Sequence, residues 1–201
     1  MKILLVTDGV FHPLLPAVRR LQRALAKVDG LNFKHVRSVE HLPDDLEGYA
    51  AVVLYFHHKE ISQAALQRLE DFISSGGGVL GVHSATASFK QEARYFDILG
   101  GRFTGHGAVK KFEIMHCGEE GVFPSSPAFS VYDELYFHDL NPNIKVQYMT
   151  IREGKEVPVV WTYQYGQGKV CYAMPGHTIR SMKNPAVQKI LQEGLKWVCS
   201  K

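Results

Sequence analysis

The segment that most constrains the fold runs from Gly76 to Ala85, where three glycines lead into a short apolar strand and then a turn with His83 at its tip. The strand carries no charged residue, which is typical of a parallel strand covered on both faces. Such turns lie at the carboxyl edge of an open α/β sheet, where ligands bind. Many α/β enzymes place a nucleophile at this turn, and here the residue is a histidine. We therefore expect His83 to face a functional crevice.

Strands and helices alternate through the first half of the chain. The apolar run at residues 1–9 predicts a first strand, and the apolar spacing at residues 14–28 predicts an amphipathic helix. Further strands are predicted at residues 32–36 and 50–56, followed by a helix that begins after Ser62 and ends at the three glycines. This alternation predicts an α/β fold, a three-layer sandwich with a mostly parallel, flavodoxin-like central sheet.

The pattern weakens between residues 100 and 148, where glycine, proline and histidine are frequent and periodic segments are short. We expect loops and small strands built over the sheet there. Residues 157–174 then predict a hairpin around a Gly-Gln-Gly turn, and Asn184-Pro185 predicts the start of a last helix. No linker or repeat interrupts the sequence, so residues 1–201 are expected to form a single domain.

Composition excludes several classes of function. The formal net charge is only +3 and the basic residues are scattered, so we expect no nucleic-acid partner. No apolar run is long enough for a secretory signal or a membrane span, so a cytoplasmic protein without a membrane partner is predicted. The three cysteines are far apart, which favours a reducing compartment. A homo-oligomer remains compatible with the sequence.

Histidines supply the most distinctive candidate chemistry. Of the ten present, five directly follow a predicted strand or hairpin: His12, His57, His58, His83 and His177. Because parallel strand ends meet at one edge, these imidazoles can converge there, with His106 of a Gly-His-Gly loop and a carboxylate of Asp133-Glu134 within reach. Imidazole and carboxylate together suit Zn, Mn, Ni or Fe. Each histidine alone is also compatible with a hydrogen-bonded turn, and a structural role is expected for His35, His41, His116 and His138.

Other chemistry fits the same turn poorly. A serine-hydrolase elbow needs serine at the tip, and Ser84 stands one position late. No cysteine occupies a strand-to-helix turn, so thiolate catalysis is not expected. The three glycines precede a strand rather than a helix, and therefore lack the context of a phosphate-binding loop.

Seven motifs spread over nearly the whole chain resemble one family. In chain order they are Phe11-His12, Gly76–Thr86, Leu99–His106, Asp133–Tyr136, Pro158–Trp161, Tyr165–Val170 and Gly176–Thr178. Together they resemble the ThuA-like family, named for trehalose utilisation, whose fold is related to class I glutamine amidotransferases. Those amidotransferases carry their nucleophilic cysteine at the position matching His83. The resemblance therefore implies the amidotransferase scaffold without glutaminase activity, since no thioester can form.

The resemblance also implies a role in the metabolism of trehalose or a related disaccharide or keto-sugar. One hypothesis is a metal-assisted enzyme, with Zn or Mn held by His83, His106, His177 and Glu134. In it His83 and His177 are catalytic, and His12 or His58 moves a proton. Five residues are expected to bind the sugar: Tyr55, His57, Thr86, Tyr136 and Trp161. The alternative is a non-catalytic carbohydrate-binding or regulatory protein that uses the same pocket.

Overall fold

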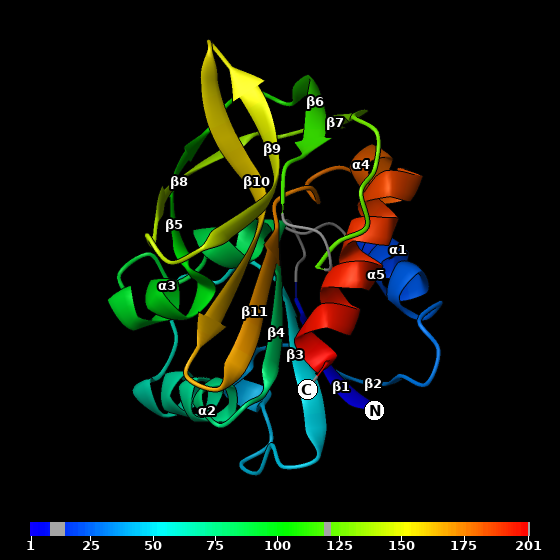
Figure 1. Ribbon diagram of the computed structural model, residues 1–201. Helices are drawn as coiled ribbons and strands as arrows, with labels where there is room; N and C mark the ends of the chain where they lie inside the picture. Colours follow the sequence, from blue (N-terminus) through cyan, green and yellow to red (C-terminus); the bar gives the residue numbers. More distant parts are fainter. Residues whose placement is uncertain (9–14, 119–121, 201) are drawn as a thin grey trace.

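A mixed β-sheet forms the centre of the molecule. The computed structural model describes residues 1–8, 15–118 and 122–200. Within these residues the main sheet has nine strands in the order β2-β1-β3-β4-β11-β10-β9-β6-β7 (Figure 1). Their bounds are β1 Lys2–Thr7, β2 Asn32–Val36, β3 Tyr49–Tyr55, β4 Gly78–Val82, β6 Lys110–His116, β7 Phe129–Asp133, β9 Lys145–Arg152, β10 Lys155–Tyr165 and β11 Gly168–Ala173. A separate two-stranded sheet pairs β5 (Gly101–His106) with β8 (Tyr136–Leu140).

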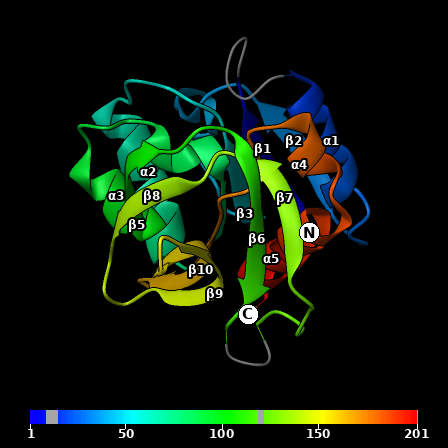
Figure 2. The ribbon, with the colours of Figure 1, turned by 90° about the horizontal axis from the view of Figure 1, so that it is seen from above.

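The strands β2, β1, β3, β4 and β11 are all parallel, and all of them except the edge strand β2 are covered on both faces. Within β1, Ile3 and Leu5 belong to one hydrophobic core, whereas Leu4 and Val6 belong to a second core on the other face. The first core includes α1 (Leu15–Leu25) and α5 (Pro185–Cys199), and the second includes α2 (Gln63–Ser74) and α3 (Ala93–Leu99). Figure 2 shows the two helical layers on opposite sides of the sheet. The predicted three-layer α/β fold is therefore confirmed.

The helix starts follow the predicted capping signals. Ser62 accepts a hydrogen bond from the Ala65 amide at the start of α2, and Asn184 accepts one from Ala186 at the start of α5. Pro185 occupies the first turn of α5, where its missing N–H has no cost. Two short 3₁₀ helices, η1 (Val39–His41) and η2 (His83–Ala87), and the short helix α4 (Ile179–Lys183) complete the described elements.

The predicted hairpin is present as the antiparallel pair β10 and β11, but residues 100–148 differ from the prediction of loops and small strands built over the sheet. From β11 onward, β10, β9, β6 and β7 join edge to edge in antiparallel pairs and extend the main sheet. Only β5 and β8 form a separate small sheet. A strand such as β6, with the sequence Lys-Lys-Phe-Glu-Ile-Met-His, is short and partly exposed, so its apolar pattern is weak. The helix α3 was also absent from the prediction.

The strand order fixes where functional side chains gather. The chain reverses direction across the sheet between β1 and β3, and ligands of open α/β sheets bind at the carboxyl ends of strands beside such a reversal. Asp8 follows β1, His57 and His58 follow β3, and His83 follows β4 at this edge. Within the described residues, no helix is long and apolar enough to cross a membrane.

Candidate functional site

His83 begins the turn directly after β4 and has a backbone φ of 43°. A positive φ is strained for a residue with a side chain and persists only where its surroundings hold it. The Tyr172 hydroxyl donates to the His83 carbonyl oxygen at 2.9 Å. Gly176 lies so close that an added Cβ there would stand 2.9 Å from the His83 Cβ. The turn is thus held from two neighbouring segments, and the His83 side chain is fully buried.

Glu134 brings two histidines together at this edge. One Glu134 oxygen, Oε2, lies 3.0 Å from Nδ1 of His177 and 3.8 Å from Nε2 of His83. The potential ligand atoms of His83, Glu134 and His177 all lie within 4.8 Å of one another. His177 follows β11 and Glu134 lies between β7 and β8, so three distant segments of the chain meet here. The predicted convergence of His83, Glu134 and His177 is therefore present in the structure.

The orientation of the His83 ring is fixed by its other nitrogen. Nδ1 of His83 donates to the Met174 carbonyl oxygen at 2.8 Å, which turns Nε2 toward Glu134. The Tyr136 ring packs against the imidazole at a centroid distance of 4.2 Å, and the His177 ring meets it edge-on at 5.4 Å. A histidine that donates one N–H to a backbone carbonyl and presents the other nitrogen is the usual arrangement of a metal ligand.

Asp133 holds the segment of Glu134 and the segment of Gly176 and His177 together. It was not among the predicted site residues. Its carboxylate is fully buried and accepts backbone N–H bonds from Gly176 at 2.7 Å, His177 at 3.0 Å and Glu134 at 2.9 Å. Burial raises the pKa of Asp133 to about 6, although these hydrogen bonds act in the opposite direction. Asp133 therefore sets the separation of Glu134 and His177. Its residue type alone gave no sign of this role.

His106 occupies a different position from the predicted loop. It is the last residue of β5, opposite Tyr136 of β8. Its Nδ1 lies 3.5 Å from Oε1 of Glu134 but only 2.9 Å from the Gly107 carbonyl oxygen. The side chain is 48% exposed. Because Nδ1 is engaged with Gly107, His106 stands beside the three-residue cluster rather than within it.

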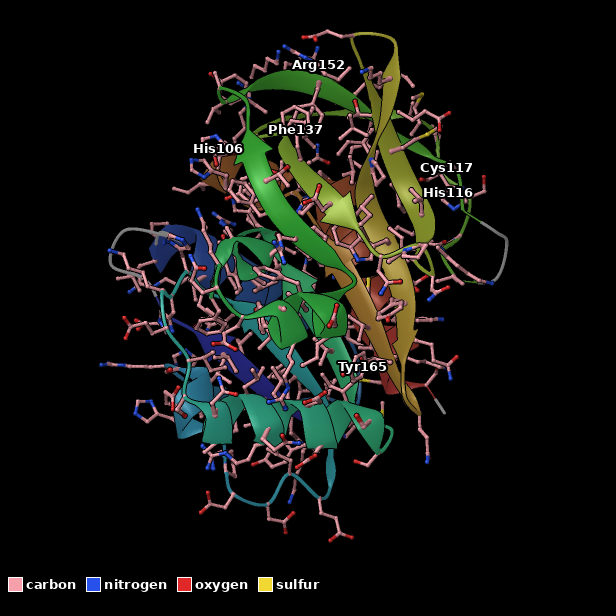
Figure 3. All side chains as sticks on the ribbon, turned by 90° about the vertical axis from the view of Figure 1, so that its left-hand side faces the viewer. His106, His116, Cys117, Phe137, Arg152 and Tyr165 are labelled. Carbon is pink, nitrogen blue, oxygen red and sulfur yellow. The ribbon has the colours of Figure 1, made fainter. Side chains whose placement is uncertain are left out.

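Exposed and half-buried side chains form a rim beside His106, which Figure 3 labels at the upper left of the molecule. The Phe103 ring stacks on the His106 ring at 6.0 Å, and the Lys90 ammonium stands 5.1 Å from the Phe103 centroid. Lys90 in turn lies near His57, where partial burial and this positive charge lower the His57 pKa. The exposed His57 therefore belongs to the rim of the site.

A second titratable pair occupies the same sheet edge. Nε2 of His58 lies 3.1 Å from Oδ2 of Asp8, and the His58 ring packs on Phe56 at 5.0 Å. Asp8 and His58 follow β1 and β3, the two strands on either side of the chain reversal. His12, the other predicted proton carrier, lies outside the described residues.

Three of the predicted sugar-binding residues are core residues. The Tyr55 hydroxyl donates to the Gly176 carbonyl oxygen at 2.6 Å, and the Trp161 indole N–H donates to that of Leu99 at 2.9 Å. Both rings and Thr86 are fully buried, so their faces do not reach solvent. Tyr136 is 3% exposed and acts through its packing on His83. The burial of these side chains was not evident from the sequence, because strand-end position does not tell a core aromatic from one that lines a pocket. Their binding of a sugar stays a prediction.

His138 supports His83 from beneath. Its Nε2 lies 3.0 Å from the Thr86 hydroxyl, which donates to the Tyr172 hydroxyl at 3.0 Å, and Tyr172 donates to the His83 carbonyl. Burial lowers the pKa of His138 to about 3, so the ring is neutral near pH 7. His138 thus has the expected structural role, and it contacts residues that hold the His83 turn in place.

The fold closely matches several solved structures. A ThuA-like protein from Parabacteroides merdae superposes with a TM-score of 0.85 at 21% identity, over 100% of this chain and 90% of that one. A cytoplasmic protein from Salmonella typhimurium LT2 gives 0.74 at 15% identity, over 98% and 99%. A β-galactosidase from Bacillus circulans gives 0.71 at 14% identity, over 98% of this chain but 30% of the enzyme. No curated protein sequence matches the chain significantly.

The sequence itself places the chain in a family. The family described as ThuA, trehalose utilisation, matches residues 2–198, almost the whole length. This range contains the β4 turn, the Asp133–Tyr136 segment and the Gly176–Thr178 segment that together build the cluster. The chain therefore belongs to the ThuA family.

Proposed function

We propose that this protein holds a divalent metal, Zn or Mn, on His83, Glu134 and His177 and acts on a sugar of the trehalose or keto-disaccharide class. The observation that carries the proposal is the approach of three potential ligand atoms to within 4.8 Å at the carboxyl edge of the sheet. Two imidazoles and one carboxylate form the ligand set of many catalytic zinc sites, which leave a fourth position open for water or substrate.

The surroundings of the cluster support a metal on chemical grounds. With the Nδ1 proton of His83 donated to Met174, the Nε2 lone pair faces a Glu134 oxygen 3.8 Å away. Two electron-rich atoms facing each other in a buried place are stabilised by a cation between them. Asp133 holds the backbone of Glu134 and His177, which is the outer support that metal ligands commonly have.

The chain's own residues have separable roles in this proposal. A bound divalent metal supplies polarisation of a sugar carbonyl or hydroxyl oxygen. His83 and His177 hold their nitrogens in place, and the rim formed by His57, Phe103 and His106 receives the sugar from solvent. His58, whose Nε2 lies against Asp8, is the candidate to accept or return a proton at its other ring nitrogen, Nδ1.

Metal analysis tests the proposal directly. The protein is purified without a histidine tag, equilibrated with Zn or Mn, passed over a desalting column and measured for bound metal per chain. We expect about one metal per chain for the wild type, and a loss of this metal in His177→Ala. The matched control is His41→Ala, an exposed histidine of η1 that is expected to keep the metal.

Sugar binding separates an enzyme from a binding protein. Trehalose and a keto derivative of trehalose are titrated against metal-loaded and chelator-treated protein, and product formation is followed in parallel. Turnover that requires the metal supports the proposed enzyme. Absence of stoichiometric metal in the wild type contradicts it, and sugar binding that persists in that case identifies a non-catalytic carbohydrate-binding protein.

A further inference from the structure

The main sheet is split beside the candidate site. The strand β6 pairs with β7 along Lys110–Ile114 but with β9 only at Met115 and His116. Toward Lys110 and Arg152, the ends of β6 and β9 therefore separate. A groove of about 370 Å³ occupies the space between them. This volume lies within the range of small-molecule sites, which is roughly 300–1,000 Å³.

The groove touches the backbone of the candidate site. Leu135, which lines it, lies between Glu134 of the cluster and Tyr136, whose ring packs on His83. The Gly107 amide, next to His106, donates to the Leu135 carbonyl oxygen at 3.1 Å. The lining residue Leu135 is thus the chain neighbour of the cluster residue Glu134.

Two cations lie on the face of the sheet that carries Asp133. Cross-strand partners point to the same face of a sheet, and side chains alternate along each strand. Since His116 pairs with Tyr148, the alternation places Lys110 and Arg152 on one face. Lys110 is also the cross-strand partner of Asp133, which holds the His177 segment. Lys110 and Arg152 therefore lie on the same face of the sheet as Asp133.

These cations have little compensating charge. Among the residues that the structure describes, Lys110 makes no ion pair, and Arg152 pairs only with its neighbour Glu153, at 2.9 Å. Glu113 also lines the groove, but by alternation it shares the opposite face with Lys111. Lys110 and Arg152 are both half-buried, which makes their charges less screened than those of fully exposed side chains.

We infer that Lys110 and Arg152 form a subsite for an anionic group, a carboxylate or phosphate, on the sugar that reaches the cluster. The inference rests on the proposed function for the sugar, and it narrows the substrate class to acidic or phosphorylated sugars. Arg152 offers the planar pair of donors that matches either oxyanion, and Lys110 adds a point charge. Phe112 and Leu135 provide an apolar wall for the ring that carries the anion.

Binding of defined probes tests the subsite. Glucuronate, glucose 6-phosphate and neutral glucose are titrated by calorimetry into the wild type and into the double variant Lys110→Met/Arg152→Met. Methionine keeps the apolar stem and removes only the charge. We expect the wild type to bind at least one anion at least tenfold more tightly than glucose, with weaker binding at high salt. The two anions distinguish a carboxylate subsite from a phosphate subsite.

In the double variant we expect the preference for the anion to disappear. The control Lys34→Met, on the opposite edge strand β2, is expected to bind like the wild type. Equal anion affinity in the double variant and in Lys34→Met overturns the inference, as does equal affinity of the wild type for the anions and glucose. Metal content is measured in the same samples. A missing metal contradicts the proposed function, whereas the comparison of anion affinities still tests the subsite.

Discussion

The two edges of the parallel sheet differ in chemistry. A groove of about 790 Å³ lies at the amino edge and is lined by Met1, Gly76, Gly77 and Lys169 among others. Lys169 in this groove already has hydrogen-bond partners at the protein surface: its ammonium donates to two Ser200 oxygens at 3.1 and 2.9 Å. The carboxyl edge instead gathers buried ligand atoms from three segments within 4.8 Å. We base the candidate site on these convergent polar groups rather than on the volume of a groove.

The largest expected effect comes from removing the carboxylate charge at the carboxyl edge. Glu134→Gln is expected to weaken binding of Zn or Mn at least about 100-fold, because the carboxylate is a direct ligand. Competition with a metal-sensitive dye measures the affinity. Asp71→Asn, which changes a carboxylate lining the amino-edge groove, is expected to leave the affinity unchanged. Equal losses of metal affinity in the two variants would contradict the claim that the metal binds at the carboxyl edge.

The next effect concerns the support of the cluster. Asp133→Asn places an amide against three backbone N–H donors, so we expect about tenfold weaker metal binding. Loss of the buried hydrogen bonds is expected to cost about 1–3 kcal/mol in unfolding free energy. Urea titration and the dye assay measure the two quantities. Asp45→Asn, an exposed turn residue, serves as the control, and unchanged metal affinity in Asp133→Asn refutes the supporting role.

A pair of glycines compares packing at the two edges. In Gly176→Ala the new methyl group meets Cβ of His83 at 2.9 Å, whereas in Gly168→Ala it meets the Ile73 carbonyl oxygen at 2.2 Å. Both changes are expected to destabilise the fold by about 1–3 kcal/mol through overpacking. Only Gly176→Ala is expected to weaken metal binding of the folded protein. Weakened binding in Gly168→Ala as well would mean that metal affinity follows stability in general.

The smallest expected effect is a pH dependence of the unfolding free energy that arises from His138. The unfolded chain protonates this imidazole near its ordinary pKa of 6.5, while the folded protein resists protonation until about pH 3. Stability therefore falls as the pH drops below 6.5, by less than about 1.4 kcal/mol for the first pH unit. His138→Gln is expected to flatten urea-unfolding free energies between pH 6.5 and 5.5, while His41→Gln leaves the slope unchanged. An unaltered slope in His138→Gln shows that this histidine is already accessible to protons.

The sequence predicted the parallel half of the fold better than the antiparallel half, for a physical reason. Strands such as β3 and β4 are buried on both faces, so their apolar runs stand out, and capping residues such as Ser62 and Asn184 fix the helix starts. The antiparallel strand β6 is short and partly exposed, and its pairing with β9 depends on contacts between distant segments. Local periodicity carries no information about such pairing.

The site was predictable where strand ends alone determine position. His83 and His177 follow buried strands, and Glu134 lies in a family motif, so their convergence could be expected from the sequence. The role of Asp133 could not, because it depends on backbone N–H groups about 43 and 44 residues away. The burial of Trp161 likewise depends on packing from both sides of the sheet.

X-ray diffraction near an absorption edge of the bound metal tests the central claim most directly. Crystals are grown from tag-free protein loaded with Zn, and anomalous difference density is measured above and below the zinc edge. The account predicts a single strong peak within bonding distance of His83 Nε2, a Glu134 carboxylate oxygen and His177 Nδ1, roughly 2.0–2.2 Å for each. Fully loaded crystals whose zinc lies elsewhere, or that show no peak among these three residues, would contradict it.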